Sequence, residues 1–260
     1  MEVLMLVAGG AAVVMGFMFV LWVTHMPLKN AAIVDVGWTF SLMLLAAYYA
    51  EQGPGWAPRN WLMAAMVAAW ATRLGSHLFL TRVWKCPEEG RYQQLRRDWK
   101  THLELKFLAF FLAQGVLDVV LSLPFLLVCL NPTPGLGPFE VTGMTLWLVA
   151  VVGEWLADFQ LAMFKADPRN RGQVCELGLW NYSRHPNYFF ESMVWVAWFL
   201  YALGSPFGWL AALSPALILF FLFRVTGIPA TEAQALRSKG EAYRRYQETT
   251  SPFVPWFKRG

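Results

Sequence analysis

The chain has 260 residues, of which 57% are hydrophobic and 15% charged, and its formal net charge is +4. This composition is too apolar for an ordinary soluble domain, and it argues against a nucleic-acid-binding protein. The three cysteines, Cys86, Cys129 and Cys175, are too scattered for a metal site or a disulfide framework, so we expect no bound metal. The composition therefore favours an integral membrane protein.

Long apolar segments predict the fold. Seven of them approach the roughly 20 residues that a helix needs to cross a bilayer, and they cover residues 3–23, 31–50, 61–83, 105–130, 141–164, 187–203 and 207–223. The first lacks the basic start and the small-residue cleavage site of a signal peptide, so we expect it to be retained. The predicted fold is an all-α bundle of seven transmembrane helices, forming a single domain over residues 1–260.

The basic residues predict how these helices are oriented. Lysine and arginine gather after residues 83, 164 and 223, whereas the loops at 51–60, 131–138 and 204–206 hold one arginine between them. Because cytoplasmic loops carry the excess of positive charge, we expect the N-terminus outside and the C-terminus in the cytoplasm. Attraction to anionic membrane lipid would also explain most of these charges. No feature of the sequence indicates an obligate protein partner.

A polar and aromatic stretch, GLWNYSRHPNYFFE at residues 178–191, leads into the sixth predicted helix. Asn187 and Glu191 lie four residues apart, so they project from one helical face. Arg184 and His185 lie at the N-terminus of this helix, where free N–H groups favour an anion. Polar groups are costly in a membrane protein and indicate function. The alternative is that the stretch only caps a helix at the membrane surface.

Other polar residues fall near the ends of predicted helices. Asp35 lies inside the second helix, where it must face the protein interior and find a partner or remain protonated. We weigh a structural hydrogen bond and a catalytic role equally for it. The charged segment at residues 85–100 is a candidate lid that offers aromatic surfaces and cations for phosphates. Its candidate cofactor contacts are Arg91, Tyr92 and Arg96.

Five motifs occur in order along the chain: IVDVGW, RLG, GRYQQLRRDW, GLWNYSRHPNYFFE and RVTGIPATEAQALRSKGEAYRRYQ. Together they resemble a bacterial member of the steroid 5α-reductase family, with the similarity strongest over residues 31–260. The resemblance implies an enzyme of the bacterial inner membrane that uses NADPH to reduce the Δ4 double bond of a 3-oxosteroid or another lipophilic enone. The cytoplasmic loops would bind the cofactor. Residues implied at the cofactor are Asp158, Lys165, Asn170, Arg171, Tyr182, Arg184, His185, Asn187 and Glu191.

The resemblance also implies a mechanism. The catalytic acid of the family corresponds to Asp35, and a protonated Asp35 in apolar surroundings would donate a hydrogen bond to the substrate carbonyl as hydride reaches the β-carbon. The tyrosine that partners this acid in the family has no clear counterpart, because Trp70 stands in the equivalent region just before Arg73. The partner of Asp35 is therefore left open.

Two other classes of protein remain as alternatives. Membrane methyltransferases that use S-adenosylmethionine share a segment similar to RHPNY, but they tend to carry adjacent acidic residues in the following helical region. Here Glu232 has no acidic neighbour in the sequence, and Asp35 would have no clear task. A transporter or scaffold is the third class. Against it, the polar residues gather toward the predicted cytoplasmic side and do not line a path across the membrane.

Overall fold

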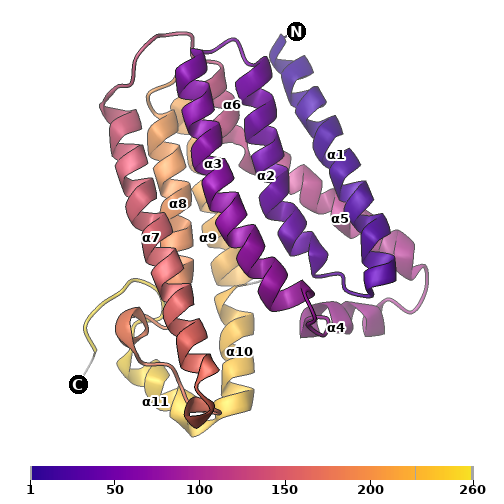
Figure 1. Cartoon of the computed structure of the whole chain (residues 1–260), viewed down its shortest axis with the longest axis vertical. Helices are drawn as coiled ribbons and strands as arrows, with labels where there is room; N and C mark the ends of the chain where they lie inside the picture. The colour runs from indigo at the N-terminus through magenta and orange to yellow at the C-terminus, as the bar shows by residue number, and fades with distance from the viewer. Residues whose placement is uncertain (1, 226, 259–260) are drawn as a thin grey trace. The chain divides into compact units, whose positions relative to one another are not determined.

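The computed structural model describes residues 2–225 and 227–258, which form helices and no strand (Figure 1). The all-α prediction is confirmed. The chain divides into two compact units. The first unit comprises Met1–Gly137 and Ala202–Ala211, and the second comprises Pro138–Tyr201 and Ala212–Gly260.

The first unit is built around one central helix. Its elements are α1 (Glu2–Leu28), α2 (Ile33–Gln52), α3 (Ala57–Leu78), a π-helix (Phe79–Val83), α4 (Gly90–Asp98), α5 (Leu103–Leu121) and α6 (Leu123–Cys129). Helix α2 packs against α1, α3 and α5, and Figure 1 shows it between α1 and α3. Its Leu42, Leu45 and Tyr49 are fully buried. Helix α2 is therefore the buried centre of this unit.

The second unit combines a long helical pair with shorter helices. Its elements are α7 (Pro138–Ala166), 3-10 turns at Pro168–Asn170 and Gly178–Asn181, α8 (Pro186–Ala202), α9 (Leu213–Arg224), α10 (Ile228–Lys239) and α11 (Glu241–Thr249). A further 3-10 turn, Gly208–Ala212, precedes α9 and belongs to the first unit except for its last residue. Helices α7 and α8 lie side by side in Figure 1. Trp195 and Trp198 of α8 are fully buried, as expected for a helix that is packed inside the protein.

Gly143 allows the close approach of α7 and α8. A Cβ atom at this position would lie 2.6 Å from the backbone nitrogen of Tyr201 and 2.7 Å from the carbonyl oxygen of Ala197. We therefore expect Gly143→Ala to lower the free energy of unfolding by about 1–3 kcal/mol, because the two backbones must separate. Gly16→Ala is the control: its Cβ meets no atom within 4 Å, so the same change should stabilise α1 by about 0.5–1 kcal/mol. Equal thermal shifts for both variants would contradict this packing.

Several helices are long and apolar enough to cross a membrane. They are Val3–Leu28, Ile33–Gln52, Pro138–Ala166 and Gly208–Lys239, and the bent pair Leu103–Leu121 with Leu123–Cys129 makes a fifth if it is one span. These helices support the predicted membrane protein. The other two predicted spans, residues 61–83 and 187–203, form helices α3 and α8 but do not meet the same measure of length and apolarity. Seven spans therefore remain a prediction.

Candidate functional site

Asp35 lies in the first turn of α2 and is the centre of an ionic cluster. Its Oδ2 accepts hydrogen bonds from Nη1 of Arg82, at 2.8 Å, and from Arg91, while its Oδ1 accepts one from the Tyr92 hydroxyl at 2.7 Å. Oε2 of Glu89 lies 3.2 Å from Nη1 of Arg82, and its Oε1 lies 3.3 Å from Nε of Arg91. We call these five residues the Asp35 cluster. Two arginines and two carboxylates make the cluster formally neutral.

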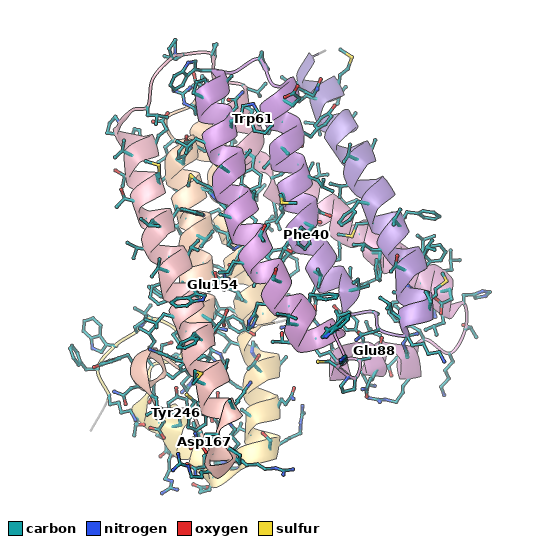
Figure 2. All side chains as sticks on the ribbon, viewed as in Figure 1. Phe40, Trp61, Glu88, Glu154, Asp167 and Tyr246 are labelled. Carbon is teal, nitrogen blue, oxygen red and sulfur yellow. The ribbon has the colours of Figure 1, made fainter. Side chains whose placement is uncertain are left out.

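Helix α4 is held against the start of α2 by a second carboxylate, that of Glu88 (Figure 2). Its Oε1 accepts a hydrogen bond from the backbone N–H of Ala31 at 2.7 Å, and its Oε2 accepts one from Arg96 at 2.8 Å. A carboxylate at this position suits the free N–H groups at the start of α2. Arg96, which the sequence predicts at the cofactor, thus pairs with Glu88 of the same chain. The contacts of Glu88 hold α4 where Arg91 and Tyr92 reach Asp35.

The surroundings of Asp35 differ from those that we expected. Its side chain is 11% exposed, and its carboxylate faces two guanidinium groups and a phenol in place of apolar side chains. Both oxygens of the carboxylate accept hydrogen bonds from these groups. The expected apolar environment is therefore wrong. The prediction fails because the π-helix and α4 bring polar groups to the N-terminal end of α2.

Tyr92 donates a hydrogen bond to Asp35, a contact that the sequence did not predict. The resemblance places a tyrosine on the third helix, where Trp70 packs edge-on against Trp38 with 5.5 Å between the ring centroids. The phenol comes from α4, on a residue that the sequence indicates as a cofactor contact. Its side chain is 1% exposed, and burial together with the Asp35 carboxylate raises the pKa of Tyr92 well above its usual range. The phenol therefore stays protonated and acts as a hydrogen-bond donor. The signal was present in GRYQQLRRDW, a motif that already counted toward the resemblance.

In the second unit the structure brings together two of the predicted residues. Nδ2 of Asn187, in the first turn of α8, donates to Oδ1 of Asp158 on α7 at 3.1 Å. Glu191 lies one turn further along α8, where its Oε1 accepts a hydrogen bond from the indole of Trp195 at 2.8 Å. The preceding turn is fixed to α7 because the indole of Trp180 donates to the carbonyl of Ala157 at 2.9 Å. An amide and a carboxylate are therefore held together at this end of α7 and α8.

Arg184 and His185 bind a carboxylate from within the chain. Nε of Arg184 lies 2.8 Å from Oε1 of Glu232 on α10, and Nε2 of His185 lies 3.2 Å from the same oxygen. Nε2 of Gln247, on α11, donates to Oε2 of Glu232 at 2.9 Å. The backbone carbonyl of Gln247 accepts a hydrogen bond from Nη1 of Arg184 at 2.6 Å. We call these four residues the Glu232 clamp. The anion that the sequence predicts at this helix N-terminus is therefore supplied, in the structure, by Glu232.

The remaining predicted cofactor residues lie around the loop between α7 and α8. Lys165 and Arg171 are exposed. Asn170 is half-buried and donates to the carbonyl of Phe164 at 2.9 Å, so its amide closes the end of α7. Tyr182 is 38% exposed and packs edge-on against Phe257, with 6.0 Å between ring centroids. The structure thus leaves cations on the surface of this loop.

Buried tyrosines predict how stability depends on pH. Burial, and then the charge of Glu232, raises the pKa of Tyr243 to about 12, and burial raises the pKa of Tyr246 still further. Tyrosine in an unfolded chain has a pKa of about 10. Above that pH the unfolded chain loses protons that the folded protein keeps, so each such tyrosine should lower the free energy of unfolding by about 1.4 kcal/mol per pH unit.

This pH dependence can be measured by unfolding the protein at pH 8 to 11 while absorbance at 295 nm reports tyrosine ionisation. Tyr246→Phe should flatten the fall in stability above pH 10. The control is Thr145→Ala, which removes a hydroxyl that does not titrate in this range and that donates only within its own helix; it should leave the slope unchanged. A slope that is the same in all three proteins would contradict the assignment.

Comparison with known proteins gives one match. No curated protein and no solved structure matches the chain significantly. A family model matches residues 21–250, a range that includes both the Asp35 cluster and the Glu232 clamp. The chain therefore belongs to this family, which is described as "Protein of unknown function (DUF1295)".

Proposed function

We propose that the protein is a membrane reductase that uses NADPH to reduce the carbon–carbon double bond of a lipid-soluble enone such as a Δ4-3-oxosteroid. The observation that carries the proposal is the Asp35 cluster, in which one carboxylate holds two guanidinium groups and a phenol. Reduction of an enone places negative charge on its carbonyl oxygen, and donors held in fixed positions stabilise such charge. The resemblance to steroid 5α-reductases supports the proposal, because its motifs include Asp35, Arg91 and Tyr92.

The role of Asp35 in this reaction follows from its partners. Both oxygens of Asp35 already accept hydrogen bonds, so its task is to fix the orientation of the donors around it. Arg91 keeps its positive charge, because burial, which lowers its pKa, is outweighed by the combined effect of the acidic groups around it, of which Asp35 contributes most. The cluster is therefore pre-organised to receive a developing oxyanion.

The residues that would hold NADPH lie in the second unit. Asp158 and Asn187 offer a carboxylate and an amide, which suit ribose hydroxyls and a carboxamide, while the exposed Lys165 and Arg171 offer cations for phosphates. This set of donors and acceptors fits the cofactor. When bound, NADPH supplies the hydride for the reduction. The Glu232 clamp would contribute by holding the polar stretch at residues 178–191 in place.

Seven membrane-spanning helices, with the N-terminus outside the bacterial inner membrane, belong to the same proposal. The supporting observations are the apolar helices and the arrangement of lysine and arginine along the chain. A membrane location also suits the substrate, because an enone lipid dissolves in the bilayer.

Thermal unfolding of the purified full-length protein tests which cofactor it binds. At a concentration of 100 times the Kd, a ligand adds about 2.7 kcal/mol to stability, so NADPH should raise the Tm by several degrees. Asn187→Ala should weaken this effect. The control is Thr145→Ala, because the Thr145 hydroxyl donates only to the carbonyl of Val141 in its own helix. Stabilisation by S-adenosylmethionine and not by NADPH would contradict the proposal and favour a methyltransferase.

A further inference from the structure

Residues 250–258, the last ones that the structure describes, follow α11 without forming a helix (Figure 1). We call residues 252–258 the tail segment. Its sequence is PFVPWFK, and its two prolines cannot donate the backbone hydrogen bonds of a helix. The side chains of Val254, Trp256 and Phe257 are 51%, 68% and 74% exposed. The tail segment thus presents a cluster of apolar side chains on the surface of the second unit.

Hydrogen bonds fix the backbone of the tail segment to the polar stretch that precedes α8. The backbone N–H of Trp256 donates to the carbonyl of Tyr182 at 2.9 Å, and the Ser183 hydroxyl donates to the carbonyl of Phe253 at 2.7 Å. The Tyr182 ring, which packs edge-on against Phe257, extends the apolar cluster. The exposed side chains are therefore carried on a backbone that is held in place.

Phe253 places the tail segment at the C-terminal end of α9. Its ring packs edge-on against Phe223 of α9, with 4.8 Å between the ring centroids, and against Phe189 of α8, with 5.7 Å. Helix α9 is the apolar part of the candidate membrane span Gly208–Lys239, and it ends at Arg224, directly after Phe223. Such a change from apolar to basic residues is typical of the place where a spanning helix meets the headgroups. The tail segment therefore lies at the level of a membrane interface.

The surroundings of the tail segment favour lipid over a protein partner. Phe220 and Phe223 are exposed on α9, so the apolar cluster continues the surface of a helix that would face lipid. The exposed cations Arg224 and Lys258, of which Lys258 also pairs with Glu176, suit the phosphates of lipid headgroups. Tryptophan is enriched at such interfaces, because its ring is apolar and its N–H is polar. A stable protein interface, in contrast, needs about 800 Å² from each partner, more than a few side chains provide.

We propose that the tail segment is a membrane anchor, and that Val254, Trp256 and Phe257 insert into the interfacial region of the leaflet at which α9 ends. Because the tail segment is bonded to the polar stretch at residues 178–191, the leaflet surface also holds that stretch in place. The anchor rests on the membrane location within the proposed function, but not on the reaction or the cofactor. Its residues follow the last of the five sequence motifs, so the resemblance gives them no role.

Electron paramagnetic resonance of a nitroxide label tests the anchor. The full-length protein is placed in vesicles of phosphatidylethanolamine and phosphatidylglycerol, with the label on Val254→Cys so that both aromatic side chains of the tail segment remain. Cys86 is replaced by serine, and the other two cysteines are buried. Collisions of the label with oxygen, which concentrates in lipid, and with a water-soluble nickel complex report its surroundings. Reference labels are placed on Phe220→Cys, on the exposed face of α9, and on Ser238→Cys, on the exposed face of α10.

The two collision rates distinguish lipid from other surroundings. We expect the Val254 label to collide often with oxygen and rarely with the nickel complex, as the Phe220 label does. Collision with nickel as frequent as at Ser238 would place the tail segment in water and overturn the anchor. Rare collision with both reagents would show that a second copy of the chain or another protein covers the segment, which would also overturn it. Frequent collision with nickel at Phe220 as well would overturn the membrane location on which the anchor rests.

A double variant, Trp256→Ser with Phe257→Ser, tests the aromatic side chains themselves. Each buried aromatic side chain shifts an insertion equilibrium at least about tenfold, so nickel collisions at the Val254 label should rise to the level found at Ser238. Both side chains are exposed, so the Tm in detergent should stay unchanged. The matched control is Trp155→Ser, which alters an exposed tryptophan of α7 and should leave the collisions as they were. A label that stays shielded in the double variant would overturn the proposal.

Discussion

Asp35→Ala is expected to lower kcat for an enone at least about 100-fold, the scale of losing fixed oxyanion donors. Without the carboxylate, Arg82 and Arg91 lose the acceptor that they share, and the Tyr92 hydroxyl, on a side chain only 1% exposed, loses its partner. An unsatisfied buried hydroxyl costs about 1–3 kcal/mol, so the Tm should fall as well. Turnover, NADPH binding and thermal unfolding of the same preparation measure these effects.

Two further variants separate the contributions. Asp35→Asn keeps an oxygen for the Tyr92 hydroxyl but removes the charge that holds the arginines, so it should recover part of the stability and little of the turnover. Glu191→Ala should have the opposite pattern, with weaker NADPH binding at nearly normal stability of the first unit. Near-native turnover by Asp35→Ala would rule out the role that we give to the cluster.

Arg184→Ala is expected to destabilise the second unit by about 3–5 kcal/mol, the usual effect of removing one partner of a buried ion pair. The side chains of Arg184 and Glu232 are only 9% and 16% exposed. The carbonyl of Gln247 also loses its donor. Urea unfolding in detergent measures the loss, and limited proteolysis should show earlier cleavage in α10 and α11.

The matched variants for the clamp are Arg184→Lys, which should recover part of the stability, and Arg184→Met combined with Glu232→Leu. The double variant removes both charges, so it should be more stable than Arg184→Ala alone. The sequence interpretation of Arg184 as a cofactor residue leads to a different result. In that case Arg184→Ala would retain its Tm and lose affinity for NADPH.

Features set by local spacing were predictable from the sequence. The four-residue spacing places Asn187 and Glu191 on one face of α8, whereas the contact of Asn187 with Asp158 on α7, at 3.1 Å, appears only in the structure. The apolar helices were predictable for the same reason, although α3 and α8 fall short of a clear membrane-spanning signal. Local patterns thus fix helices and the faces on which polar residues lie.

Contacts between distant segments were not predictable. Tyr92 lies 57 residues from Asp35 in the sequence, and no periodicity links α4 to the start of α2. The same limit applies at the Glu232 clamp. The residues Arg184 and His185 correctly indicated a binding site for an anion, but the local sequence did not show that Glu232, from α10, would occupy it.

The most direct test of the central proposal is to supply the detergent-purified protein with NADPH and progesterone, and to identify the product by mass spectrometry. We expect consumption of NADPH and a product two hydrogen atoms heavier than progesterone, absent without the cofactor and formed at least about 100-fold more slowly by Asp35→Ala. An unchanged steroid, from a protein that S-adenosylmethionine stabilises and NADPH does not, would contradict the account.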